Sequence, residues 1–256
     1  MYENKKKIFS VILFTFLSLA IILLILFNPQ KKTGGNIKVM EITGNKLMSS
    51  KEYEKFIRNN GTKPAQTFNL SILKDRVLKH PYVENADIEF LGDGKAQVNI
   101  REKKITAILL SKGEPLFLTN QSEVLPILSN SRFSSIPIIS NPKNINDVKP
   151  GTIIKSNELS DALRIIDAIR YTDRKMLLNL SEINLRNGGD IILTFSGIKP
   201  PVIFGRGATA RKIIYLEMLW PGLLKGEMLV NNSSYIDLRF ADNIYVGKLE
   251  KIGYKQ

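Results

Sequence analysis

The chain has 256 residues, a formal net charge of +13, no cysteine and one histidine. Without cysteine there is no disulfide and no thiolate nucleophile, and one histidine cannot build a histidine-rich zinc site. A serine–histidine–aspartate triad would have to use His80, which directly precedes a proline and is typical of a turn residue near the surface. The composition therefore disfavours most catalytic classes and favours a fold that is stabilised by packed cores.

An unbroken apolar run covers residues 8–27 and follows Lys5, Lys6 and Lys7. As a helix it would be roughly 30 Å long, which is one hydrocarbon thickness. The run is longer than the core of a cleaved signal peptide, and no small-x-small cleavage site follows it. We predict an uncleaved transmembrane signal-anchor in the cell inner (plasma) membrane. The lysines keep residues 1–7 as a cytoplasmic tail, and the bulk of the chain is exported.

The positive charge of the exported part has several interpretations. Export disfavours nucleic acid as the partner, although a basic domain often binds it. Anionic lipid headgroups, anionic wall polymers or acidic protein partners fit an exported basic surface better. The excess of lysine is also consistent with a surface that only keeps the protein soluble.

The first exported region has the pattern of a small α+β unit. Residues 28–36 are typical of a short linker, and a strand is expected over 37–43. Helices are expected over 50–59, capped by Ser49 or Ser50, and over 70–79. Strands over 83–90 and 96–101 flank a turn that contains glycines. The expected order is strand, helix, helix, strand, strand.

From residue 105 the pattern changes to short strands with turns and two longer helices. Pro126 and Pro137 interrupt two apolar segments, 125–127 and 136–139, which we expect to be edge strands or extended loops. The helix expected over 209–219 should end at Trp220-Pro221-Gly222. The other expected elements are strands over 105–110, 116–118, 182–186, 190–195, 202–204, 235–240 and 244–246, and a helix over 157–171 that is capped by Ser156.

Short motifs occur in an order that resembles one known family. Ile42-Thr43-Gly44-Asn45 is similar to a V-x-G-N strand end, and Leu78-Lys79-His80-Pro81-Tyr82-Val83 to an L-x-x-x-P-W-V step. Ile100-Arg101-Glu102 is similar to the exit of the same domain, and Leu193 to Gly205 to a later strand pair. Tyr235-Ile236-Asp237-Leu238-Arg239-Phe240 resembles a terminal Y-V-D-L-R-Y strand. Together they resemble the FtsQ/DivIB bacterial cell-division proteins, although Ile105 and Asn243 stand where that family usually has proline and glycine.

The resemblance implies an α+β protein with a single N-terminal transmembrane helix. A POTRA-like βααββ domain would cover 37–103. A larger mixed domain of the FtsQ type, with an antiparallel sheet and helices, would cover 104–248, and 249–256 would be a C-terminal tail. The family is non-catalytic, so no cofactor, metal, nucleic acid or small-molecule substrate is expected.

The implied function is a scaffold of the division septum. It would recruit the FtsB/FtsL-type coiled-coil pair and other divisome or septal wall-synthesis proteins. The physical route would be the addition of a partner strand to an exposed sheet edge. The resemblance places partner-binding residues on the last strand, on its return and on the preceding helix: Tyr235, Ile236, Asp237, Leu238, Arg239, Phe240, Ile244, Tyr245, Val246 and Arg211.

Three of these residues have alternative roles that the sequence leaves open. Phe240 matches a family tyrosine that anchors the partner, and the alternative is a core side chain. Arg211 offers a bidentate fork to an acidic partner residue, and the alternative is a solvated helix face. Asp237 and its neighbour Arg239 fit a structural pair as well as a partner contact.

The sequence leaves three other functions to compare with this one. Gly205-Arg206-Gly207-Ala208-Thr209-Ala210 fits G-x-G-x-x-A, with Glu227 about 20 residues on, but a dinucleotide site expects that acid at the end of a second parallel strand, and a loop is expected here. The glycines then serve a tight strand-to-helix turn.

An anchored wall-processing enzyme could use carboxylates such as Glu182 and Asp190. A POTRA-type chaperone of a secretion or outer-membrane assembly machine would need several such units or a barrel.

Overall fold

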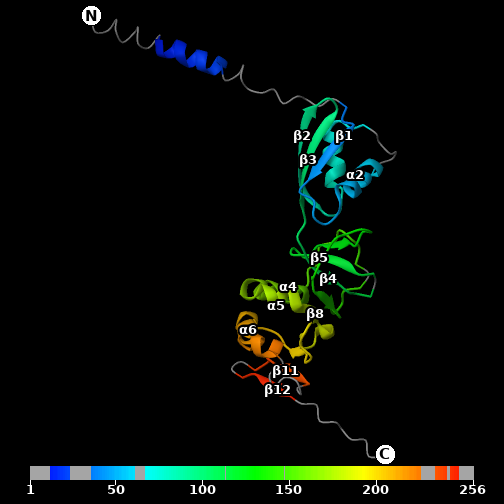
Figure 1. Cartoon of the computed structure of the whole chain (residues 1–256), viewed down its shortest axis with the longest axis vertical. Coiled ribbons are helices and arrows are strands. Elements are labelled where there is room, and N and C mark those ends of the chain that lie inside the picture. Colours follow the sequence, from blue (N-terminus) through cyan, green and yellow to red (C-terminus); the bar gives the residue numbers. More distant parts are fainter. Residues whose placement is uncertain are drawn as a thin grey trace, which may run out of the picture.

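The computed structural model describes residues 12–23, 36–60, 67–112, 114–146, 148–225, 234–240 and 243–247. Within these ranges the chain forms six α-helices and two mixed sheets (Figure 1). The α+β class is therefore confirmed. A three-stranded sheet with two helices forms the first folded unit, and a nine-stranded sheet with three helices forms the second.

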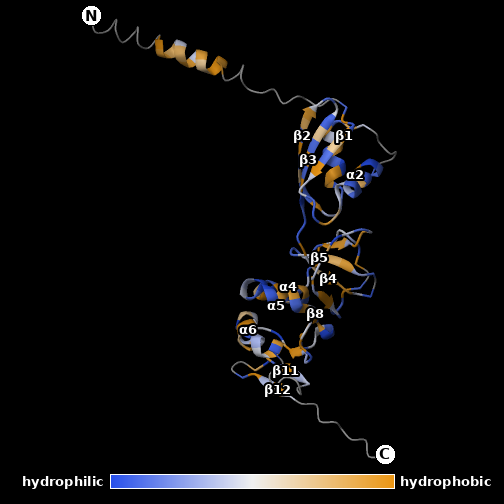
Figure 2. Ribbon diagram, viewed as in Figure 1, coloured by the Kyte–Doolittle hydropathy of each residue, from blue (hydrophilic) through white to orange (hydrophobic). Residues whose placement is uncertain are grey.

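Residues 12–23 form a helix that is hydrophobic along its length (Figure 2). Its large side chains, such as Phe14 and Phe16, are exposed. No helix in the described ranges is both long enough and apolar enough to cross a membrane. The rest of the expected anchor, residues 8–11 and 24–27, lies outside the described residues, as do the expected tails 1–7 and 249–256 and linker residues 28–35, so the anchor stays a prediction.

The first unit has the element order that the sequence predicts. The strands β1, β2 and β3 lie in the order β1-β3-β2, with β1 parallel and β2 antiparallel to β3. Helices α2 and α3 come between β1 and β2 in the chain. The bounds are β1 Val39–Thr43, α2 Ser50–Asn59, α3 Leu70–Leu78, β2 Val83–Gly92 and β3 Lys95–Glu102.

Local chemistry explains these boundaries. Ser49 caps α2 by accepting from the backbone N–H of Glu52, and Asn69 caps α3 in the same way. Gly44 ends β1 with φ +82°, and a Cβ there would lie 2.1 Å from the carbonyl oxygen of Ile100. Only glycine fits that left-handed, close-packed position.

Glu102, at the end of β3, fixes the loop between β1 and α2. Its carboxylate accepts the backbone N–H groups of Lys46 and Leu47 at 3.0–3.1 Å. It also accepts the hydroxyl of Tyr53 at 2.6 Å. Burial, together with this hydrogen bond, raises the pKa of the Tyr53 phenol. The glutamate of the family-like exit motif thus has a structural role.

The core of the first unit continues into the second. Buried residues of α2 and α3, such as Ile57 and Leu73, share one apolar cluster with Phe117 and Leu125, which lie beyond residue 104. The hydroxyl of Tyr82 lies 2.9 Å from the carbonyl oxygen of Pro126 and accepts the backbone N–H of Leu128 at 2.9 Å. The predicted domain boundary at 103/104 is therefore crossed by packing and by hydrogen bonds.

His80 is the clearest departure from expectation in the first unit. The sequence predicts a turn residue near the surface, but its side chain is 1% exposed. The imidazole packs against the rings of Tyr53, Phe56 and Tyr82, with centroid distances of 4.4, 4.5 and 5.4 Å. The position before proline does end the helix, but the ring turns into the aromatic core.

The second sheet has the strand order β12-β11-β10-β9-β8-β7-β4-β5-β6. The pairs β4–β7, β7–β8 and β10–β11 are parallel, so the sheet is mixed, and the predicted antiparallel sheet is wrong. The bounds are β4 Ile105–Leu109, β5 Leu116–Thr119, β6 Val124–Pro126, β7 Ile138–Ser140, α4 Asn157–Thr172, α5 Arg174–Asn179, β8 Leu180–Asn184, β9 Ile192–Phe195, β10 Val202–Ile203, α6 Thr209–Lys225, β11 Tyr235–Asp237 and β12 Tyr245–Gly247.

Two proline predictions are corrected. β6 is an edge strand as expected, but β7 lies in the interior of the sheet between β8 and β4. Pro137 lies one residue before β7, outside the strand, and its carbonyl accepts from Ile108 N–H at 2.9 Å, so the missing N–H of the proline does not stop β7 from pairing with β4. Helix α6 continues through Pro221, because Trp220 and Leu223 are buried. The indole of Trp220 packs edge-on to Phe195 at 5.0 Å.

Helices α4, α5 and α6 lie together beside the nine-stranded sheet (Figure 1). Buried residues of α4 and α6 form one core with strands β4 to β11, including Ile166, Leu193, Leu216 and Ile236. The short helix α5 was not predicted. Asp173 begins it by accepting from the backbone N–H groups of Lys175 and Met176.

Candidate functional site

Strand β12 is the outermost strand at one end of the nine-stranded sheet. It pairs antiparallel with β11 on one side, with Ile236 opposite Val246 and Asp237 opposite Tyr245. Among the described residues no strand pairs with its other side. The sequence predicts the edge at 235–240 with its return. The structure places β11 inside the sheet, between β10 and β12, so the open edge is β12 alone.

Half of the predicted site residues build the sheet and do not form its surface. Ile236, Asp237 and Leu238 are buried. Tyr235 is half-buried, and its phenol ring covers Gly247, where a Cβ would lie 2.1 Å from the ring. Ile244 packs against the second core. These five residues fix the hairpin from within.

Phe240, Tyr245 and Val246 are the exposed large apolar residues of this hairpin in the described part of the chain. The rings of Phe240 and Tyr245 are each 51% exposed and meet edge-on at 5.0 Å. The guanidinium of Arg239 lies 5.9 Å from the centroid of Phe240. The alternative that Phe240 is a core residue is therefore wrong. An exposed aromatic pair beside an open strand is typical of a protein-binding surface.

Asp237 and Arg239 form the structural pair that the sequence left open. Arg239 donates from Nε and Nη2 to the Asp237 carboxylate at 2.6–3.1 Å, and from Nη1 to Asp190 at 2.8 Å. These hydrogen bonds hold the pKa of Asp237 below its ordinary value and raise the pKa of Arg239. The pair orients the chain where β11 ends, just before Phe240.

The turn between β10 and α6 supports the same hairpin. Gly205 has φ +64°, and a Cβ there would lie 2.7 Å from Cγ of Arg239. The glycine therefore leaves room for the arginine stem. This confirms the predicted tight strand-to-helix turn. It also explains why a larger residue would not fit at position 205.

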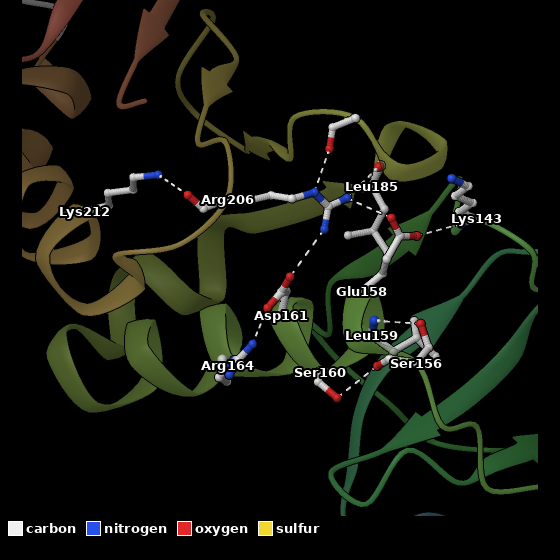
Figure 3. A network of polar contacts seen from close by, with 11 residues as sticks. Lys143, Ser156, Glu158, Leu159, Ser160, Asp161, Arg164, Leu185, Arg206 and Lys212 are labelled. Carbon is white, nitrogen blue, oxygen red and sulfur yellow. Dashed lines mark hydrogen bonds and ion pairs between the residues drawn. The ribbon is translucent and has the colours of Figure 1, made fainter. Parts of the chain in front are cut away.

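Arg206, in that turn, is the centre of a polar network that the sequence did not predict (Figure 3). It donates to Glu158 at 2.8 Å, to Asp161 at 3.3 Å and to the carbonyl of Gly189 at 3.0 Å. The buried ammonium of Lys212 donates to the carbonyls of Phe204 and Arg206. The network ties the turn to α4 and to the β8–β9 connection. The i,i+3 acids on a predicted helix were the signal that could have suggested it.

Arg211 lies exposed on α6, near the start of that helix. Its position next to the buried Lys212 places it on the outer side of the helix. Burial lowers the pKa of Lys212. The nearby carboxylates of Asp190 and Asp237 raise it, but burial is the larger effect. The structure leaves the predicted contact between Arg211 and an acidic partner as a prediction.

The G-x-G-x-x-A segment lies between β10 and α6. The sequence predicts a loop around Glu227, and the strand that follows α6, β11, runs parallel to β10. An acid does end that strand, and it is Asp237, whose carboxylate is held by Arg239. Glu227 lies outside the described residues. The turn holds Arg206 and the stem of Arg239, so a dinucleotide site gains no support.

The carboxylates of the enzyme alternative are bound to other side chains. Glu182 accepts from the hydroxyl of Ser140 and from Asn184, and Asp190 accepts from Arg239. In the part of the chain that the structure describes, no three histidine, aspartate or glutamate side chains are grouped to hold a metal ion. Comparison of the chain with protein-family models and with curated proteins gives no match.

Proposed function

We propose that the protein is a non-catalytic membrane-anchored scaffold of the bacterial divisome, of the FtsQ/DivIB type. Its exported part would recruit FtsB/FtsL-type partners at the division septum, and other septal proteins with them. The observation that carries the proposal is the open edge of β12 beside the exposed pair of Phe240 and Tyr245. The order of the first five elements and the apolar helix over residues 12–23 agree with this class.

The binding mechanism follows from the geometry of the edge. A partner segment would add a strand to β12, and main-chain hydrogen bonds would supply much of the contact. Ring faces that are half exposed in the free protein would become buried, which makes Phe240 and Tyr245 the expected anchors. The ion pairs of Arg239 pre-organise the hairpin, so less entropy is lost on binding.

The test is a calorimetric titration of the full chain with the exported segments of an FtsB/FtsL pair. Phe240→Ala should weaken binding at least about 10-fold, as expected for an aromatic anchor. Phe133→Ala is the matched control, because Phe133 is 47% exposed and also packs edge-on to an aromatic ring at 5.0 Å, that of Phe117. Equal weakening by both changes, or none by Phe240→Ala in a folded protein, would refute the edge mechanism.

A further inference from the structure

A solvent-open hollow of about 410 Å³ lies where the two folded units meet, far in sequence from β12. Side chains of α2 and the segment around Leu128 form its walls. Met48, Phe56 and Leu128 supply apolar surface, and Glu52 and Lys55 supply charge. The imidazole of His80 is part of the wall. The hollow is thus lined by both folded units, where the first core continues into the second.

His80 carries a hydrogen-bond donor that no described group satisfies. Its Nδ1 accepts the backbone N–H of Tyr82 at 3.1 Å. In a neutral imidazole the proton then resides on Nε2, which makes Nε2 a donor. This atom is buried and has no partner in the described part of the chain. Buried unsatisfied donors are rare and destabilising, so an acceptor from outside the chain would be favourable here.

The charges around the hollow indicate the kind of acceptor. One carboxylate, Glu52, and one ammonium, Lys55, border it, so it presents no net charge. Glu52 also accepts from the amide of Asn130 at 3.3 Å, which holds this carboxylate at the border. Burial lowers the pKa of His80 to about 4, so the ring is neutral at ordinary pH. A neutral oxygen matches this setting better than a carboxylate or a phosphate.

The size of the hollow and the residues of its walls indicate which kind of side chain could supply this neutral oxygen. The volume admits a large planar side chain. Phe56 offers a ring and Met48 a thioether, and both make favourable contacts with aromatic rings. Phe56 is half-buried and packs edge-on to His80. Nε2 itself is buried, so wall side chains have to move before an occupant can reach it. Among side chains, tyrosine combines a large ring with a neutral terminal oxygen.

We propose that this hollow receives a tyrosine side chain of a protein partner, whose phenol oxygen accepts the hydrogen bond of His80 Nε2. The ring would lie against Met48, Phe56 and Leu128, and the partner backbone would pass between Glu52 and Lys55. This site is separate from the β12 edge and does not depend on the proposed function. It makes the first unit a second docking surface.

The chain contains one histidine, so its imidazole gives an unambiguous nuclear magnetic resonance signal. The full chain, labelled with ¹⁵N-histidine in detergent micelles, is titrated with N-acetyl-tyrosinamide and separately with N-acetyl-phenylalaninamide. The tyrosine compound should shift the Nε2 resonance saturably and bind about 5-fold more tightly than the phenylalanine compound, since only its hydroxyl can accept.

A variant and three contrary outcomes complete the test. His80→Phe keeps an aromatic ring but lacks the donor, and calorimetry should then give equal affinities for the two compounds. The proposal is overturned by the absence of a saturable shift in the unsubstituted chain. It is also overturned by equal affinities there, or by an ordered water that stays on Nε2–H when the tyrosine compound is in excess. All three readings come from the unsubstituted chain, so they hold even if His80→Phe fails to fold.

Discussion

The two edge strands of the nine-stranded sheet differ in how far other parts of the chain cover them. At one end, β6 is covered: Leu125 is 1% exposed and belongs to the core of the first unit. The outer backbone of Val124 is also satisfied, since its N–H donates to the carbonyl of Thr152 at 2.9 Å and its carbonyl accepts from Gly151 at 2.7 Å. At the other end, β12 has exposed side chains and no described outer strand.

This difference indicates where a partner is expected. Unpaired strand edges are liabilities that proteins cover, shorten or charge. The chain closes the β6 end with its own loop and core. At the β12 end it instead arranges an aromatic pair and an arginine fork around the strand. Ordered side chains beside an edge that no described strand covers favour recognition of a partner over mere exposure.

The largest expected effect separates the two ends by stability. Leu125→Ala should lower the free energy of unfolding by about 2–5 kcal/mol, because it opens a cavity where the two units meet. Val246→Ala should lower it by less than about 1 kcal/mol, because Val246 is 43% exposed. Urea denaturation of both variants measures the contrast. Comparable losses at the two positions would mean that the β12 end is covered in the folded protein.

A smaller effect is the pH dependence of the free energy of unfolding that arises from His80, which lies on the β6 side of the molecule. The pKa of His80 falls from 6.5 to about 4 on folding, so the unfolded state binds the proton more tightly. The corresponding stability is complete above pH 6.5 and is lost as the pH falls through 4, by at most about 3.5 kcal/mol at about 1.4 kcal/mol per unit. Denaturation at pH 7 and at pH 4 measures it, and His80→Phe should lack that part of the loss. An identical loss in the variant would assign the pH dependence to the carboxylates.

The smallest effect concerns the support of the open end. Gly205→Ala should lower the free energy of unfolding by about 1–3 kcal/mol, because it adds a contact with Arg239 to the strain of a positive φ. Gly207→Ala is the control: its φ is +71°, but nothing lies within 4 Å of the added Cβ, so only about 1 kcal/mol is expected. Thermal melts give both values. If Gly207→Ala is the more harmful change, the Arg239 contact does not support the hairpin.

The locally encoded features were predictable from the sequence. Ser156 caps its helix as predicted, and Ser49 is one of the two candidates predicted for its helix, because a cap is set by the residues that follow it within one turn. The order of the first five elements was predictable for the same reason, since each has its own period and turn residues. The resemblance predicts an anchor role for Phe240, which stays a prediction, and the structure shows that Phe240 is exposed.

The features that the sequence did not predict depend on tertiary contacts. Helix α6 passes Pro221 because Trp220 and Leu223 reach the core there, and packing overrides a local stop signal. His80 is buried because aromatic side chains from α2 and from Tyr82 surround it. The position of β12 outside β11 depends on which strands pair, which short strands of two or three residues do not encode.

The most direct test of the central claim is amide hydrogen exchange at residues 243–247, followed in the full chain with and without the exported segments of an FtsB/FtsL pair. Strand addition pairs only the outward-facing backbone groups of β12. Ile236 directs its N–H to Pro201 on the β10 side, so Val246, which lies opposite Ile236, faces outward, and the account predicts that exchange of the Val246 amide slows at least about 10-fold in the complex. The β6 strand, already covered, should show no change. Binding without any slowing at β12 would contradict the account and would place the partner elsewhere on the molecule.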